Sequence, residues 1–149
     1  MKVHEIMSRN PYCCSPQSTL IDIASRMRDM DVGIIPVCEG KEMRGVITDR
    51  DIVIRAMVMG LNPAMTLAEQ VMSVDVTCCF EDQDVGEAVA LMEEKQIRRL
   101  VVLNRENQLV GMISLGDIAA RGSYYERCGE ALSVISKPSP MPAKLPGTV

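Results

Sequence analysis

The sequence predicts an α/β fold in which two related β-α-β-β-α repeats, related by a pseudo-twofold axis, pack as one module. The chain has an internal repeat, because a shift of 65 positions carries Ile6 onto Val71 and Cys13-Cys14 onto Cys78-Cys79. Each copy contains short β-branched runs between amphipathic segments. A unit of roughly 55 residues is marginally stable alone, so we expect the two copies to share one hydrophobic core.

The first helix of each copy follows a capping signal. Thr19 and Asp84 each precede a segment with apolar residues at helical spacing and an acidic residue three positions on, which predicts helices beginning after them. Short β-branched runs then predict a pair of strands in each copy, at 34–37 and 45–47 in the first and at 100–103 and 111–113 in the second.

A second helix closes each copy. It is expected to begin near Asp49 and end at Gly60 in the first copy, and to run from about Leu115 to Gly122 in the second. Residues 2–7 and 67–72 match each other as short lead-in turns. The domain boundaries that follow are a first repeat at 2–60, a linker at 61–66, a second repeat at 67–122, a C-terminal helix at 123–136 and a disordered proline-rich tail at 137–149.

Composition excludes several classes of partner. Aromatic residues make up only 3% of the 149-residue chain and its net charge is −4, which disfavours binding to nucleic acid. No apolar run approaches the roughly 18 to 20 residues needed to span a bilayer, and the N-terminus does not resemble a signal peptide. We therefore expect a cytoplasmic protein with no nucleic-acid or membrane partner.

The titratable side chains show no pattern typical of a catalytic site. His4 is the only histidine, which removes the usual general base and most zinc ligand sets. We expect no catalytic residue, no metal and no obligatory cofactor. The doubled cysteines at matching strand positions leave one alternative open, because they can bring four thiols near the pseudo-twofold axis as a redox or metal sensor. Buried, reduced cysteines are the commoner reading of the same pattern.

One motif carries possible binding chemistry in both copies. Gly45-x-x-Thr48-x-x-Asp51 and Gly111-x-x-Ser114-x-x-Asp117 stand where the last strand meets the second helix. A capping box explains the hydroxyl and the carboxylate of either copy alone. The same helix start also suits an anion, and a carboxylate there can accept hydrogen bonds from a ribose diol. Its occurrence in both copies, each time after a glycine that lets a ligand approach the backbone, favours the binding role.

The duplicated pattern, the run Ile34-Ile35-Pro36-Val37 and the two junctions together resemble a tandem pair of CBS domains, called a Bateman module, over roughly residues 2 to 122. The chain is similar to bacterial stand-alone proteins of two CBS domains. The resemblance implies a non-catalytic regulatory module that binds adenosine-containing ligands such as AMP, ATP, NAD or S-adenosylmethionine in two composite clefts. It implies that the aspartate holds ribose hydroxyls and that the threonine or serine approaches the phosphate.

Carried over residue by residue, the resemblance implies two sets of ligand-binding residues. The first cleft joins Thr48, Arg50 and Asp51 with residues of the second copy, namely Val76, Thr77, Ile97, Arg98, Arg99 and Leu100. The second joins Ser114 and Asp117 with residues of the first copy, namely Pro11, Tyr12, Val32, Gly33, Ile34 and Ile35.

The two clefts are expected to differ in their affinity for phosphate. Gly33 and Ile34 stand where the first cleft has Arg98 and Arg99, so the Thr48–Asp51 cleft is expected to be the better site for a phosphorylated ligand. We also expect a homodimer, because Met30, Met57 and Met59 lie on exposed helices, and an unknown downstream protein. A ligand-free oligomerisation or interaction protein is the alternative, in which the two motifs only cap helices.

Overall fold

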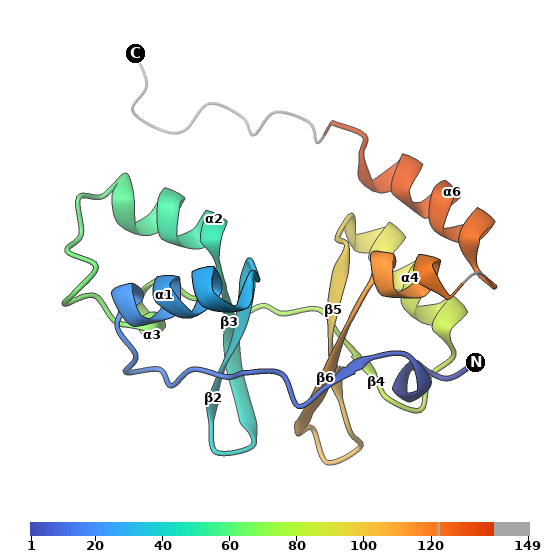
Figure 1. The fold of residues 1–149 in the computed structure, drawn as a ribbon, viewed down its shortest axis with the longest axis horizontal. Coiled ribbons are helices and arrows are strands. Elements are labelled where there is room, and N and C mark those ends of the chain that lie inside the picture. Colours follow the sequence, from blue (N-terminus) through green and yellow to red (C-terminus); the bar gives the residue numbers. More distant parts are fainter. Residues whose placement is uncertain (122, 139–149) are drawn as a thin grey trace.

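The computed structural model describes residues 1–121 and 123–138. Figure 1 shows two halves side by side, with a small sheet at the centre of each half and helices packed around it. The α/β class and the two-repeat arrangement are confirmed. The expected helix end at Gly122 and the part of the expected tail after residue 138 lie outside the described residues, and the boundaries between repeats and linker stay predictions.

The first half is built as the sequence patterns indicate. Thr19 caps its first helix, since its Oγ1 accepts a hydrogen bond of 3.3 Å from the Asp22 N–H. A wide π-helical turn continues the second helix, and Gly60 then takes a positive φ of 66° just beyond it. The elements are α1 (Leu20–Met30), β2 (Ile34–Glu39), β3 (Glu42–Thr48), α2 (Asp49–Asp51) and the π-helix η2 (Ile52–Met57).

The second half repeats this order and adds a helix. Asp84 caps its first helix by accepting a 2.8 Å bond from the Gly86 N–H. Cys78 and Cys79 lie in a true strand, whereas the equivalent Cys14 makes only a single bridge to Val37. The elements are β4 (Cys78–Phe80), α4 (Val85–Lys95), β5 (Arg99–Leu103), β6 (Leu109–Ser114), α5 (Leu115–Ala120) and α6 (Tyr125–Ile135).

The two halves exchange their lead-in segments. Strand β1 (Ser8–Arg9) belongs to the first repeat by sequence but pairs antiparallel with β6, so the larger sheet has the order β1-β6-β5-β4. In return Ser73, just after helix α3 (Ala68–Val71), bridges Val46 on β3. Each sheet is therefore completed by the segment that precedes the other repeat.

The buried apolar residues form two clusters, so the expectation of one shared core is wrong. One cluster lies in the second half and includes Val3 from the short helix η1 (Val3–Glu5). The other lies in the first half and includes Ala68 and Val71 from α3. Exchange of the lead-in segments gives each half the extra apolar side chains that its roughly 55 residues lack.

The glycines of the two motifs serve this exchange and do not leave space for a ligand, as the sequence had suggested. A Cβ atom on Gly45 would lie 2.5 Å from the carbonyl oxygen of Ser73. One on Gly111 would lie 2.6 Å from Met7 Sδ and 2.9 Å from the carbonyl oxygen of Ser8. Only glycine lets the lead-in backbone approach so closely.

Candidate ligand-binding site

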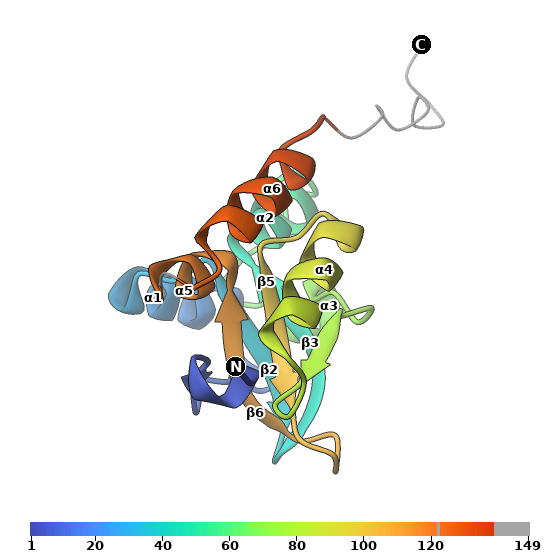
Figure 2. The ribbon, with the colours of Figure 1, turned by 90° about the vertical axis from the view of Figure 1, so that its right-hand side faces the viewer.

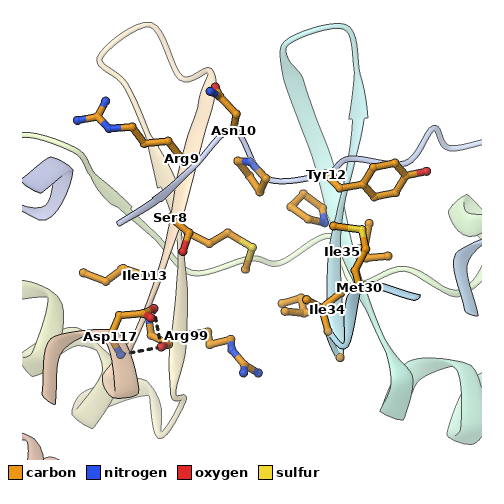
Figure 3. Close-up of a pocket in the computed structure, with 16 residues that line it drawn as sticks. Ser8, Arg9, Asn10, Tyr12, Met30, Ile34, Ile35, Arg99, Ile113 and Asp117 are labelled. Atoms are coloured by element: carbon orange, nitrogen blue, oxygen red, sulfur yellow. Dashed lines mark hydrogen bonds between the residues drawn. The ribbon is translucent and has the colours of Figure 1, made fainter. Parts of the chain in front are cut away.

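A cavity of about 390 Å³ lies between the two halves, where β6 turns into α5 (Figure 3). Strand β1 and the residues after it form one wall, and the start of β2 with the end of α1 forms another. The structure brings together here all eight residues predicted for the second cleft: Pro11, Tyr12, Val32, Gly33, Ile34, Ile35, Ser114 and Asp117. Sequence reasoning missed Ser8, Met30 and Met112, which also line the cavity.

Ser114 and Asp117 form the capping box that the sequence indicates. The Asp117 N–H donates to Ser114 Oγ over 3.0 Å, while the N–H and the hydroxyl of Ser114 donate to Asp117 Oδ2 over 2.9 and 2.6 Å. Within the described part of the chain, both bonds of this carboxylate go to Oδ2. The other oxygen, Oδ1, is therefore available to accept hydrogen bonds from a molecule in the cavity.

The cavity carries polar side chains together with Ile113 at one end and is mainly apolar at the other. Figure 3 shows Asp117 and the Ser8 hydroxyl on the β6 side, with Ile34, Ile35 and Met30 on the β2 side. Tyr12 lies at the apolar end, and its ring stacks against the Arg26 guanidinium at 5.3 Å. Such a cavity suits a molecule with one hydrogen-bonding part and one flat or apolar part.

Arg99 lines this cavity, although the sequence placed it in the other cleft. It starts β5 directly opposite Ser114 on β6, so the strand register puts it beside its own repeat's motif. Its side chain is exposed and forms no ion pair among residues 1–121 and 123–138. The second arginine in the lining, Arg9, instead donates a 2.8 Å bond to the His4 carbonyl.

The position of Arg99 removes the main reason for ranking the Thr48–Asp51 cleft first. That ranking assumed that no cation faces Ser114 and Asp117. Gly33 has a different role, because a Cβ atom there would lie only 3.0 Å from Asp49 Oδ2. Gly33 thus leaves room for the Asp49 carboxylate. The cation of this cavity, Arg99, lies on the opposite wall.

Thr48 and Asp51 form a second capping box, with the Asp51 N–H donating to Thr48 Oγ1 over 3.0 Å. Here the carboxylate has other partners, since Asp51 Oδ1 lies 3.7 Å from the Arg55 guanidinium and accepts a 3.5 Å bond from Ser73 Oγ. Arg55 also donates to the Val71 carbonyl over 3.0 Å. The carboxylate of the first motif thereby helps to hold the lead-in segment of the second repeat.

The remaining residues predicted for the first cleft are not equally placed to contact a ligand. Leu100 is 1% exposed and its side chain belongs to the second core, so it can offer only main-chain atoms. Ile97 packs against the same core. Val76 and Thr77 are half-buried before β4, while Arg50 and Arg98 are exposed.

The doubled cysteines of the two repeats do not gather at one place: Cys13 and Cys14 lie beside Cys38 in the first half, and the Cys38 N–H donates to the Cys14 carbonyl over 2.9 Å. All six are free thiols, and Cys14 and Cys79, which the repeat aligns, are buried in different cores. Among the described residues no group of three or more His, Cys, Asp or Glu side chains is arranged to hold a metal ion. Burial raises the pKa of Cys14 to about 11 and that of Cys79 to about 12, so both thiols are protonated at neutral pH.

These raised pKa values predict a loss of stability at alkaline pH. The pKa of these thiols is 9.0 in the unfolded chain, so they ionise there at a lower pH than in the folded protein. Between about pH 9 and pH 11 the unfolded state therefore binds fewer protons than the folded state, and the free energy of unfolding falls as the pH rises. Urea unfolding between about pH 7 and pH 10.5 measures this fall. The Cys14→Ala, Cys79→Ala double variant is expected to show a shallower one, and equal slopes would contradict the assignment.

Comparisons with known proteins agree with this fold. The CBS domain profile matches residues 3–57 and 68–123. The CBS domain-containing protein YhcV of Bacillus subtilis is 36% identical over 134 residues, covering 90% of this chain and 94% of that protein. An uncharacterised protein of Methanopyrus kandleri is 38% identical, and the chain spans 61% of its length.

Solved structures share the architecture. Hypoxic Response Protein I, whose crystal structure contains two coordinated zinc ions, superposes with a TM-score of 0.73 at 31% identity, covering 81% of this chain and 98% of that one. CBSX2 in complex with AMP gives 0.71 at 17% identity, covering 84% and 98%. The CBS domain pair of protein MJ0100, in complex with 5′-methylthioadenosine and S-adenosyl-L-methionine, gives 0.71 at 20%, covering 81% and 94%.

One further finding concerns membranes: no helix within residues 1–121 and 123–138 has the length and apolar character needed to cross one. The duplicated fold, the paired capping motifs and the profile matches over most of both halves lead to one identification. The chain belongs to the CBS-domain family, as a tandem pair of CBS domains.

Proposed function

We propose that the chain is a non-catalytic regulatory module that binds an adenosine-containing ligand in the cavity at Ser114 and Asp117. The observation that carries the proposal is the unengaged Asp117 Oδ1 in a cavity of about 390 Å³ with an apolar far wall. A ribose diol offers two donors to such an oxygen, and the base is a flat group that suits the apolar end. Solved CBS-domain pairs with AMP and with S-adenosylmethionine support this class of ligand.

AMP is the ligand that the charges favour within this class. The Arg99 guanidinium, which forms no ion pair within residues 1–121 and 123–138, can serve as a bidentate partner for one phosphate group, and charge-assisted bonds of this kind are about twice as strong as neutral ones. Asp49 does not line the cavity, but its carboxylate lies beside Gly33 of the opposite wall, and a negative charge near that wall disfavours the longer phosphate chain of ATP. NAD and S-adenosylmethionine remain members of the class to be compared.

The Thr48–Asp51 cleft is proposed as the weaker site. Its carboxylate already interacts with Arg55 and Ser73, so a ligand must displace these contacts before it can bind there. This reverses the order that the sequence suggested. The residues proposed to contact ligand there are Thr48, Arg50, Asp51, Val76, Thr77, Ile97 and Arg98, with the main chain of Leu100.

A thermal-shift panel tests the proposal on the full chain. AMP, ADP, ATP, NAD, NADH and S-adenosylmethionine are compared, because a ligand at 100 times its dissociation constant stabilises the folded state by about 2.7 kcal/mol. We expect the largest rise in melting temperature with AMP. A rise with no member of the panel would reject adenosine binding and favour a protein whose motifs only cap helices. Arg99→Gln, whose side chain takes no part in the hydrogen bonds of either capping box, is expected to reduce the rise with AMP but not that with adenosine.

A further inference from the structure

A second cavity, of about 480 Å³, lies where the turns of the two strand pairs meet. The turn between β2 and β3 and the turn between β5 and β6 lie at the same end of the molecule, as Figures 1 and 2 show, and the Leu109 N–H donates to the Lys41 carbonyl there. The segment after β1 forms the remaining wall. We call this space the turn cavity, and it shares only Asn10 and Pro11 with the proposed nucleotide cavity.

Two thiols face the turn cavity. Cys14 bridges Val37 on β2, and both side chains are buried in the core of the first half. Because successive side chains of an extended segment point to opposite faces, the neighbours Cys13 and Cys38 point away from that core. Both line the turn cavity, where Cys13 is half-buried and Cys38 is 8% exposed. The fold thus brings together two thiols that are 25 positions apart in the sequence.

The two thiols lie close enough for Cys13 to affect the ionisation of Cys38. Burial and the neighbouring Cys13 thiol raise the pKa of Cys38 to about 12. Main-chain hydrogen bonds hold the two segments together, since the Cys14 N–H donates to the Pro36 carbonyl and the Cys38 N–H to the Cys14 carbonyl, each over 2.9 Å. Cys13 is the more accessible thiol, so it is the one that reacts first with a molecule in the cavity.

The second half has no equivalent pair among its described residues. A shift of 65 positions carries Cys13 onto Cys78, and the two have a similar local geometry, because each Sγ donates over 3.5 Å to the carbonyl two residues before it. The same shift carries Cys38 onto Leu103, which has no thiol. The repeat therefore supplies a matched single thiol in the same molecule.

We propose that the turn cavity binds a low-molecular-weight disulfide that carries carboxylate groups, and that this molecule oxidises Cys13 and Cys38 to an intramolecular disulfide. The Cys13 thiolate attacks the bound disulfide, forms a mixed disulfide and releases one small thiol. Cys38 then attacks the Cys13 sulfur and releases the second small thiol. Two protein thiols and one small disulfide become one protein disulfide and two small thiols, so atoms and electrons balance.

The cavity has the size and polarity for such a molecule. Small-molecule sites usually enclose about 300 to 1,000 Å³, and this one encloses about 480 Å³. Asn10 and Gln108 contribute amide groups to the lining. Lys41 also lines the cavity and is exposed, and it forms no ion pair within residues 1–121 and 123–138, so its ammonium group suits a carboxylate.

The new bond would join the segment after β1 to β2. Tyr12, next to Cys13, and Pro36, two residues before Cys38, line two walls of the proposed nucleotide cavity, so oxidation would hold these walls together. The oxidation itself does not depend on nucleotide binding. A crosslink that closes a loop of this length is expected to raise the melting temperature by about 5 to 10 °C. A lower melting temperature of the oxidised protein would contradict the proposed pairing.

Mass spectrometry of the full chain tests the reaction, with oxidised glutathione as the probe at about pH 8. After alkylation of the remaining thiols, the wild type is expected to have lost two hydrogen atoms, with Cys13 linked to Cys38 in its peptides. Cys38→Ser is expected to stop at one glutathione on Cys13, and Cys13→Ser to form neither product. The matched control, Cys78→Ser, is expected to react as the wild type does.

Lys41→Gln tests the cavity as a binding site. It is expected to slow the reaction with oxidised glutathione by about two- to fivefold, the contribution of an exposed ion pair, and not the reaction with uncharged hydroxyethyl disulfide. An unchanged rate with glutathione would contradict the binding role of the cavity. A crosslink between other cysteines, or attachment of glutathione to Cys78 as fast as to Cys13, would overturn the assignment of the pair. Circular dichroism checks that the variants fold, and Cys38→Ala replaces Cys38→Ser if the serine variant does not.

Discussion

Replacing Asp117 with alanine is expected to weaken AMP binding by about ten- to a hundredfold while the protein stays folded. A hydrogen bond to a charged acceptor contributes about 1.5 to 3 kcal/mol, and Asp117 Oδ1 is the acceptor proposed for the ribose. Losing the capping box costs only about 1 kcal/mol of stability, which is small against the roughly 5 to 15 kcal/mol typical of a folded domain. Calorimetric titration of AMP into the variant measures the loss of affinity.

The matched control is Asp51→Ala in the other capping box. Its carboxylate interacts with Arg55 and Ser73, so its removal is expected to lower the melting temperature and to leave the tighter AMP binding event in place. The two variants thus separate a ligand contact from a structural one. If Asp51→Ala removes the tighter event and Asp117→Ala spares it, the ranking of the two clefts is wrong.

Val3→Asp is expected to lower the melting temperature by about 10 °C or more, or to prevent folding. Val3 is fully buried in the core of the second half, and an aspartate there has to lose its hydration or expel the N-terminal segment. Either outcome costs about 3 kcal/mol or more, and a chain of this length loses roughly 3 to 4 °C per kcal/mol.

Val74→Asp supplies the control, because Val74 carries the same side chain at 71% exposure next to the other exchanged segment. We expect its melting temperature to stay within about 2 °C of the wild type. Calorimetry or circular dichroism melts provide the comparison. Equal effects of the two substitutions would show that the N-terminal segment does not contribute to the second core.

The sequence predicts well what local signals control. Helix starts depend on capping residues such as Thr19 and Asp84, and strand pairs depend on short β-branched runs, so both appear where expected. The residues around the cavity were predicted from the resemblance to CBS pairs. That resemblance indicates which distant segments lie together, which the hydrophobic periodicity of the sequence does not. Whether they bind a ligand stays a prediction.

What the sequence does not predict depends on distant contacts. Val3 and Ser8 lie in a short polar-flanked segment with no strand pattern, and their partners are about a hundred positions away. Which of the two clefts Arg99 lines depends on the face of β5 that it occupies. A pair of adjacent arginines in the sequence does not reveal which of them occupies which face. The glycines before the two motifs suggested ligand access, although the atoms that approach them belong to the protein's own backbone.

The exchange of lead-in segments also affects the order in which the chain can fold. Strand β1 is synthesised about a hundred residues before its partner strand β6, since Ser8 lies opposite Met112. The second sheet therefore cannot be completed until most of the chain exists, and closing so large a loop is slow compared with forming local helices. The core of the first half likewise cannot be completed until Ala68 and Val71 have been synthesised. Although the sequence reads as two successive repeats, the molecule matures as one interdependent unit whose N-terminus docks late.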